Sequence, residues 1–371
     1  MRGVALILSL ALAGCASPGP TDRSAFHLDL RGRGLDPASV VIPFEVTDEM
    51  RAWVRQRVPE AGSMEERLDK LLAALISEDG LGITYERGRT DIAPVAFANR
   101  KANCLGFTSL FVGLARAIGV PAFYLDVEDV ESFERDGDLL VISGHVSAAF
   151  DVGGGHLKIL EFADAPRVEY RRIRRLHDLT AVSLYYSNVG AELLRAGRAE
   201  EALTWLRQAT VIDPDLGDGW VNLGVALRRA GDLDGAEKAY RRALEADSGA
   251  ASAYQNLAAL LRFRGRAAEA DELMALASRA IDQSPFSYLA LGDLSLANGR
   301  REEARRFYRR ALRLGHDDPE PYAALGLAAL AGGDLGEAKK WLRKATALGP
   351  DNKRVRRLAG ELGVAKGERK G

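Results

Sequence analysis

Small and apolar residues recur with a fixed period in the second half of the chain. Glycine or alanine returns every 34 residues in five successive units. The four series are Gly190, Gly224, Ala258, Gly292 and Gly326; Gly197, Gly231, Gly265, Gly299 and Gly333; Ala202, Ala236, Ala270, Ala304 and Ala338; and Ala209, Ala243, Ala277, Ala311 and Ala345. A small residue lets a neighbouring helix approach closely, and a glycine between two helices permits the turn. The pattern predicts five helix pairs over residues 183–352 and a capping helix with a tail over 353–371.

The pattern before residue 180 is different and predicts an α+β domain over residues 45–180. Apolar residues fall on one face of residues 65–76 and of residues 103–118, as in amphipathic helices. Short strands are predicted at 123–130, 139–142, 145–152 and 156–162. The glycines at 153–155 predict a hairpin turn between the last two strands. The basic run at 167–175 is expected to be a solvated helix face, and contact with lipid head groups is the alternative.

The N-terminus has a third pattern, a positive Arg2 followed by an apolar run from Val4 to Leu12. Nine residues are too few to span a bilayer as a helix and suit the hydrophobic segment of a signal peptide over residues 1–14. Residues 15–44 have no sustained periodicity and are expected to form a tether.

The end of the apolar run, Leu12-Ala13-Gly14-Cys15, resembles the lipobox of bacterial lipoproteins. The resemblance implies cleavage before Cys15, acylation of Cys15 with lipid such as palmitate, and membrane attachment without a spanning helix. Ala16 stands where an Asp would resemble the inner-membrane retention signal. We therefore expect a lipid anchor in the outer membrane that faces the periplasm. The alternative is a plain secretory signal whose cysteine is coincidental.

Composition narrows the classes of partner and site. A chain of 371 residues with 47% apolar and 28% charged residues suits two soluble folded regions. A net charge of −1 gives no indication of nucleic-acid binding. The sequence contains no HExxH, CxxC or phosphate-binding loop, so no metal and no cofactor are expected.

The chain has two cysteines, so Cys104 has no disulfide partner if Cys15 carries lipid. Asn103 is a good N-cap for the helix that follows, which puts the Cys104 thiol in its first turn. There the helix dipole and free backbone N–H groups favour the thiolate. A nucleophilic thiolate needs a nearby imidazole, and His145 at the start of a strand is the best candidate. The alternative is a buried, inert cysteine.

A third residue should be an acid that orients the imidazole. Glu161 lies on the strand next to that of His145. An even hairpin register, for example residue 152 opposite residue 156, puts Glu161 on the same sheet face as His145, whereas an odd register brings Asp164 there instead. The sequence leaves both registers open.

These residues carry a family resemblance. Residues 103–108 (NCLGFT), 114–116 (LAR) and 119–121 (GVP) resemble the nucleophile helix of bacterial transglutaminase-like proteins, and residues 144–146 (GHV) resemble their histidine strand. The resemblance implies a papain-like fold in which Cys104 is the nucleophile, His145 the base and Glu161 the acid. The family usually has Asp at that place. Glu161 therefore bears on activity more than on fold, because an extra methylene displaces the carboxylate.

The repeating half resembles the tetratricopeptide repeat through Trp220, Leu223, Gly224, Ala236, Tyr240 and Ala243. The resemblance implies an all-α solenoid whose first helices line a groove for a protein or peptide partner. Groove positions in the first three units are Arg195, Arg228, Arg229, Gln255 and Arg262. Those in the last two units are Phe286, Leu289, Leu296, Leu327 and Leu330.

We therefore expect a groove that is basic near the cysteine domain and apolar farther out. It would bind a peptide with acidic groups beside apolar ones. Alternatively, the arginines only solubilise the surface and the apolar positions pack against the C-terminal helix.

Two functions from different classes follow. The first is thiol-dependent acyl transfer, or amide or peptide hydrolysis, through a thioester on Cys104 in the cell envelope. The second is a catalytically inactive scaffold whose repeats recruit a protein partner at the membrane.

Overall fold

The structure is a computed structural model of the whole chain. It describes residues 7–11, 23–86, 88–136, 139–153, 156–160, 173–280, 285–297 and 299–363. Side chains are described for these residues apart from 7–11, 23, 127–136, 139–145, 153, 278–280, 286, 294 and 297. The chain forms two compact units, Met1–Glu134 with Val141–Ala239, and Arg135–Leu140 with Tyr240–Gly371.

The first unit begins with a group of helices, two of which start with a side-chain N-cap. Their bounds are α1 Arg23–Gly32, α2 Asp48–Arg57, α3 Met64–Ile76 and α4 Ala93–Asn99, with a short 3-10 helix at Pro37–Ser39. The Thr47 side chain accepts from the Met50 N–H at the start of α2. Ser63 and Glu66 form a reciprocal capping box at the start of α3. Thr and Ser are residue types that favour N-cap positions, so both caps are evident in the sequence.

The predicted tether is wrong from residue 23 onward. Phe26 and Leu30 of α1 are four residues apart on one face, and both are buried in the core of the unit. A Cβ atom on Gly113 of the central helix would lie 2.4 Å from the backbone oxygen of Phe44, so this part of the chain packs tightly as well. The apolar residues Ala25, Phe26, Leu28 and Leu30, among polar neighbours, are too short a pattern to predict such packing.

Helix α5 (Cys104–Ala117) is the centre of the first unit, and residues 105 to 115 are all buried. Such a helix needs apolar neighbours on every side. Some of them come from a five-stranded sheet of order β1-β6-β5-β4-β7. The strands are β1 Ile7–Ala11, β4 Phe123–Asp136, β5 Leu139–Gly153, β6 His156–Leu160 and β7 Ile173–Leu176. Two further strands, β2 Thr84–Tyr85 and β3 Lys101–Ala102, form a parallel pair.

Three features of this sheet differ from the sequence prediction. Strand β5 is one continuous strand where two short ones were predicted. Residues of the predicted signal peptide form β1, which pairs antiparallel with β6 from Ile7 opposite Leu160 to Ala11 opposite His156. The end of the basic run forms β7 rather than a helix, and the Arg175 guanidinium lies 3.9 Å from the centre of the Phe123 ring. That cation–π contact fixes a residue expected to face only solvent.

The two faces of the sheet belong to different apolar clusters. Val146, Ala148, Phe150 and Leu160 join the core around α5, whereas Phe123, Leu125, Ala149, Leu157 and Ile159 form a second cluster. Lys158 on β6 is also buried. Burial alone lowers its pKa, but hydrogen bonds to Asp69 (2.7 Å) and Glu65 (3.1 Å) of α3 outweigh burial and raise the pKa overall. The ammonium group therefore ties α3 to the sheet as a charged group.

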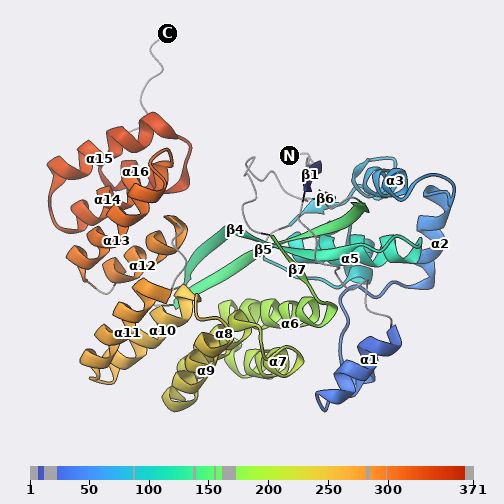
Figure 1. Cartoon of the computed structure of the whole chain (residues 1–371), viewed down its shortest axis with the longest axis horizontal. Helices are drawn as coiled ribbons and strands as arrows, with labels where there is room; N and C mark the ends of the chain where they lie inside the picture. The colour runs from blue at the N-terminus through green and yellow to red at the C-terminus, as the bar shows by residue number, and fades with distance from the viewer. Residues whose placement is uncertain are drawn as a thin grey trace, which may run out of the picture. The chain divides into compact units, whose positions relative to one another are not determined.

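The repeats form consecutive helix pairs (Figure 1). Their bounds are α6 Asp178–Arg195, α7 Ala199–Ile212, α8 Gly217–Arg229, α9 Leu233–Ala246, α10 Ala251–Phe263, α11 Ala267–Ala280, α12 Pro285–Ala297, α13 Arg301–Leu314, α14 Pro319–Ala331 and α15 Leu335–Leu348. A last helix, α16 (Lys353–Glu361), follows.

Glycines of both series have the structural roles that their spacing predicted, in turns and at close contacts between helices. Gly197, Gly231, Gly265, Gly299 and Gly333 all have positive φ, between 73° and 86°, in the turns within pairs. At Gly190 and Gly292 a Cβ atom would lie 2.5 Å from Leu206 and 2.3 Å from Tyr308 of the following helix. These glycines therefore allow the two helices of a pair to approach closely.

The first repeat is part of the core of the cysteine domain. Leu179, Val182 and Tyr186 of α6 and Ile212 of α7 belong to the same apolar cluster as α5. The first unit accordingly continues through the first repeat to Ala239, inside α9. The predicted domain boundary at residues 180–183 is therefore not a break in the core. In an array, one face of a repeat packs against the repeat before it. In this first repeat that face packs against the cysteine domain.

Candidate active site and the repeat surface

Cys104 is the first residue of α5 and has a free, partly exposed thiol. Asn103 has an extended backbone, and its side chain accepts a hydrogen bond of 2.8 Å from the Gly106 N–H. This is the N-cap that the sequence predicted. The thiol therefore lies at the positive end of a well-capped helix, where the dipole favours an anion.

The Asn103 side chain is itself held by two residues that the sequence did not indicate. Its Nδ2 donates to Thr90 Oγ1 at 2.8 Å, and Thr90 Oγ1 donates to Glu192 Oε1 of α6 at 2.8 Å. A Cβ atom on Gly106 would lie 3.1 Å from the backbone oxygen of Asp91, so residues 90 and 91 pack directly against the first turn of α5.

Burial raises the pKa of the Glu192 carboxyl above its ordinary value of 4.5. The hydrogen bond from Thr90 and the positive charge of Arg195 act in the opposite direction, whereas Asp91 adds to the rise. Burial likewise raises the pKa of the neighbouring Tyr185 to about 12. Glu192 is thus a constrained carboxyl group in a largely desolvated place.

The strand of His145 passes beside the nucleophile helix. The Thr108 hydroxyl, one turn after Cys104 and on the same helix face, donates to the Val146 backbone oxygen at 3.1 Å. The backbone that directly follows His145 therefore contacts the side of α5 that carries the thiol. The side chain of His145 lies outside the described residues.

The hairpin of β5 and β6 has the even register over its described pairs. Ala148 lies opposite Leu160 and Phe150 opposite Lys158, and a bulge follows at Asp151 and Gly153. This is one of the two registers that the sequence left open. Glu161 and Asp164 lie outside the described residues, so the choice between them stays a prediction.

The other end of α5 is also bound to α6. Both Nη atoms of Arg116 contact the two carboxylate oxygens of Asp178, at 2.9 and 2.8 Å. Arg116 Nε donates to the Ala122 backbone oxygen at 3.0 Å. Because Arg116 and Asp178 are largely buried, this bidentate pair is among the stronger polar contacts of the unit. It lies about 20 Å along α5 from the thiol, at 1.5 Å per residue.

The predicted partner-binding residues of the repeats divide into three groups. Arg195 and Arg229 are exposed, and Arg229 Nη1 also donates to the Leu194 backbone oxygen at 2.8 Å. Arg228 is half-buried and Arg262 contacts Asp271 at 3.2 Å. Gln255 departs from the prediction because its side chain is buried and its Nε2 donates to the Ala290 backbone oxygen at 2.7 Å. Gln255 therefore holds two repeat helices together.

The predicted apolar part of the groove is corrected in the same way. Leu327 is a core residue of a cluster that includes Val355 and Leu358 of α16, and Leu296 and Leu330 pack against that cluster. Leu289 is buried, and the side chain of Phe286 lies outside the described residues. Packing against the C-terminal helix, the alternative left open by the sequence, accounts for Leu296, Leu327 and Leu330.

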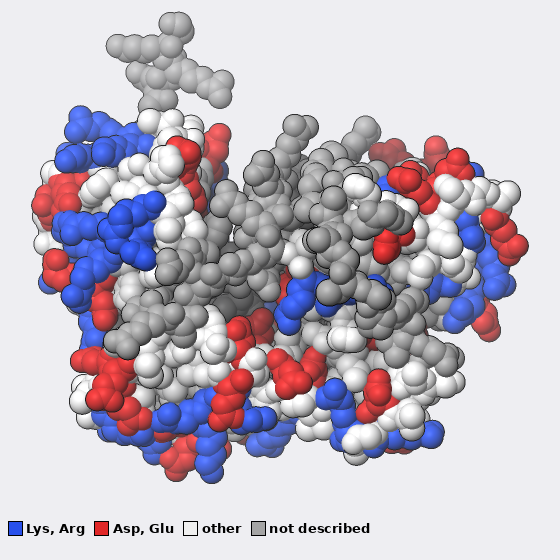
Figure 2. All heavy atoms as spheres, viewed as in Figure 1, with Lys and Arg blue, Asp and Glu red and all other residues white. Residues whose placement is uncertain are grey.

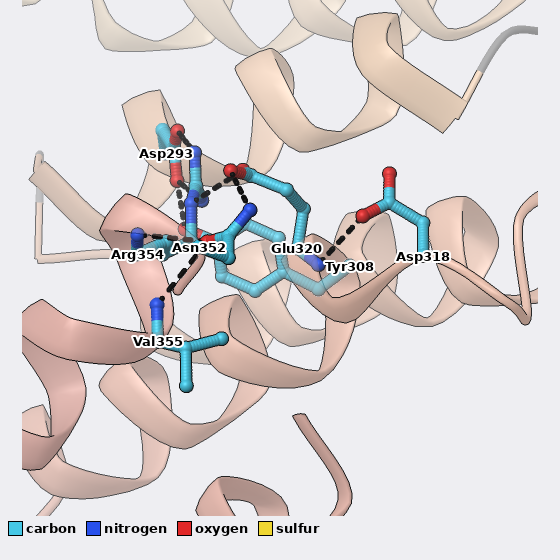
Figure 3. A network of polar contacts seen from close by, with 7 residues as sticks. All are labelled: Asp293, Tyr308, Asp318, Glu320, Asn352, Arg354 and Val355. Carbon is cyan, nitrogen blue, oxygen red and sulfur yellow. Dashed lines mark hydrogen bonds and ion pairs between the residues drawn. The ribbon is translucent and has the colours of Figure 1, made fainter. Parts of the chain in front are cut away.

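A polar network joins α16 to the last two repeats (Figure 3). The guanidinium of Arg354 contacts both oxygens of Asp293, at 2.6 and 2.7 Å, and its Nε lies 2.9 Å from Glu320 Oε2. Tyr308 donates to Asp293 at 2.7 Å, and Asn352 donates to Glu320 at 2.9 Å. Burial lowers the pKa of Arg354, but the two carboxylates raise it by a larger amount. The pKa of Arg354 therefore lies above its ordinary value.

Charges elsewhere are mixed. On the face drawn in Figure 2, basic and acidic side chains are interspersed over the helices. Within the described residues, His, Cys, Asp and Glu form no group of three or more that could hold a metal ion. In the same part of the chain, no helix combines the length and the apolar character needed to cross a membrane.

Comparison with known families matches both halves of the chain. The transglutaminase-like superfamily matches residues 51–138, and tetratricopeptide repeat families match residues 190–208, 217–250 and 295–362. The chain therefore contains a transglutaminase-like domain followed by several tetratricopeptide repeats, as its motifs predicted. The transglutaminase-like match includes Cys104 and ends before His145. A comparison with curated proteins finds no match.

Solved structures similar to the chain are tetratricopeptide repeat proteins. A thermophilic repeat protein of Thermus thermophilus is 23% identical with a TM-score of 0.37, over 48% of this chain and 98% of that one. PilF of Pseudomonas aeruginosa is 24% identical with a TM-score of 0.33, over 49% and 85%. MamA of Desulfovibrio magneticus is 20% identical with a TM-score of 0.32, over 46% and 97%.

Proposed function

We propose that the protein is a lipid-anchored protein of the bacterial envelope whose transglutaminase-like domain uses Cys104 as a nucleophile on a peptide-like substrate. The thiolate attacks an acyl or amide carbon, the amine or other group leaves with a proton, and water or an amine resolves the thioester. His145 is the proposed base and Glu161 the proposed acid, with Asp164 as the alternative. The repeats hold the protein or peptide partner, and acylated Cys15 holds the chain at the membrane.

The observation that carries this proposal is the place of the thiol. Cys104 is free, partly exposed and the first residue of a helix with a fixed N-cap. An inert structural cysteine is normally buried among apolar groups, whereas a nucleophile needs access and a positive electrostatic environment. The Val146 backbone beside Thr108 adds support, because it brings the strand of His145 to the same side of α5.

The scaffold function is the second candidate. The family match that ends at residue 138 favours it, because the proposed base and both proposed acids follow that point. In this alternative the cysteine domain serves as a rigid base for the repeats.

Activity-based labelling separates the two functions. Wild type and Cys104→Ala are exposed to an iodoacetamide probe in envelope fractions, and His145→Ala is a second variant. The proposal expects rapid labelling of Cys104 at neutral pH and a covalent acyl adduct on wild type alone. Labelling only after denaturation would favour the scaffold. Metabolic labelling with an alkyne fatty acid, compared between wild type and Cys15→Ser, tests the anchor.

A further inference from the structure

Helix α6 is connected to the nucleophile helix near both of its ends. Asp178, its first residue, contacts Arg116 near the end of α5, and Glu192 contacts Asn103 at the start of α5 through Thr90. The two contacts are 14 residues apart on α6 and 13 apart on α5, counted from 178 to 192 and from 103 to 116. The two helices therefore run antiparallel, and contacts of matching spacing fix their register.

The contact at the thiol end has a defined direction. Asn103 donates from Nδ2 to the Thr90 hydroxyl, that hydroxyl donates its single proton to Glu192, and the Asn103 oxygen accepts from the Gly106 N–H. A Thr90 hydroxyl without its acceptor would be free to rotate, and Asn103 would lose its fixed partner. Glu192 is the last residue in this series of hydrogen bonds, and of its three residues it alone lies on a repeat helix.

We propose that Glu192 is a positioning residue for Cys104, and that it acts through Thr90 to fix Asn103 and the first turn of α5. The inference rests on the proposed role of Cys104 as a nucleophile and extends it. A helix of the repeat array determines the orientation of the groups that stabilise the thiolate. Removing the carboxylate loosens the cap and weakens the electrostatic effect of the helix N-terminus on the thiol.

The charged and titratable groups around Glu192 come from two segments. Arg195 and Tyr185 lie on α6 itself, and Arg89 and Asp91 lie in the segment before α4. Arg89 is bound to Asp91 at 2.8 Å, so its charge is largely compensated. The positive charge of Arg195 also acts on the Glu192 carboxyl. The hydrogen bond from the Thr90 hydroxyl is the contact that connects Glu192 to Asn103.

The test measures the rate at which iodoacetamide alkylates Cys104 in the full chain as a function of pH, with the modified residue identified by mass spectrometry. Glu192→Ala and Thr90→Val should slow the reaction at neutral pH about fivefold, the factor that corresponds to the loss of one N-cap interaction. Glu192→Gln and Thr90→Ser keep an acceptor and a hydroxyl, so both should retain most of the wild-type rate.

Tyr186→Phe is the matched control, because it removes a hydrogen bond from the same helix to residue 41 and leaves the Asn103 contacts intact. It should leave the rate and its pH profile unchanged. Wild-type rates in Glu192→Ala and Thr90→Val would overturn the inference. An equal slowing by Tyr186→Phe would overturn it as well, since general loosening would then suffice. Wild type that reacts only when denatured would instead refute the proposed function itself.

Discussion

The first and last repeats follow the same 34-residue pattern but pack against different neighbours. At Gly190, in the first repeat, an added Cβ atom would meet Leu206 of the same helix pair. At the corresponding Gly326, in the last repeat, it would meet Leu358 of α16. The first repeat shares its core with α5, and the last shares its core with the C-terminal helix. The 34-residue pattern therefore predicts the helix pair, but it does not predict which part of the protein packs against that pair.

The largest expected effect comes from removing the first repeat. A chain that ends at residue 177 loses Leu179, Val182, Tyr186 and Ile212 from the core of the cysteine domain. Each buried side chain of this size contributes about 1.5–3 kcal/mol, and a domain is stable by only about 5–15 kcal/mol. We expect this chain to be unfolded by circular dichroism. A chain that ends at residue 247 keeps these residues and should fold, and a folded 1–177 chain would contradict the shared core.

The next effect concerns the other end of the array. Arg354→Met leaves the partly buried Asp293 and Glu320 carboxylates without their counter-charge, which should cost about 2–3 kcal/mol in the unfolding free energy. Urea denaturation followed by circular dichroism measures this change. Adding Asp293→Asn and Glu320→Gln removes the unpaired charges and should recover much of the loss. No recovery would mean that packing of the Arg354 stem, rather than charge, is responsible.

A smaller effect compares single hydrogen bonds in the two units. Tyr186→Phe removes the acceptor of the Val41 N–H at 2.8 Å, in a partly buried place, and should cost about 1–2 kcal/mol. Tyr322→Phe removes an exposed hydrogen bond of 3.1 Å to the His316 oxygen and should cost less than about 0.5 kcal/mol. Thermal unfolding of both variants gives the comparison, and equal costs would contradict the different burial of the two contacts.

The smallest effect is the dependence of stability on pH. Burial raises the pKa of Glu192 above 4.5. As the pH rises, the unfolded chain therefore releases the Glu192 proton first, and the folded protein releases it at a higher pH. The folded state binds more protons in this window, so the contribution of Glu192 to stability falls as pH rises from about 4.5 through the raised pKa. Glu192→Gln lacks this term. The difference in unfolding free energy, wild type minus variant, should therefore decrease over that window, and a constant difference would contradict the assignment.

Much of each half could be predicted because the signals are local. Asn103 before Cys104 predicts a capped helix, and the turn glycines predict the repeat pairs with their positive φ. The hairpin register could be narrowed to two possibilities, and the described pairs have the even one.

The rest depends on contacts between distant residues that leave no periodic trace. Thr90 and Glu192 are 102 residues apart, and neither belongs to a motif. In the sequence, Lys158 is a single polar residue within an apolar strand. Its partners Asp69 and Glu65 lie on α3, so the sequence around Lys158 does not indicate them. The helix at Phe26 and Leu30 carries too few apolar residues to stand out from a tether. Gln255 and Leu327 occupy groove positions by count, but tertiary packing buries them.

The double attachment of α6 to α5 has a consequence for how the array evolves in length. Repeat arrays gain or lose units most easily where each unit contacts only its neighbours. Helix α6 cannot be exchanged in this way, because Asp178 and Glu192 belong to the cysteine domain as much as to the repeat. Duplication and deletion are therefore confined to the units that follow. Among relatives of this protein, the number of repeats should vary after the first pair, while an acidic residue at the position of Glu192 persists beside the cysteine.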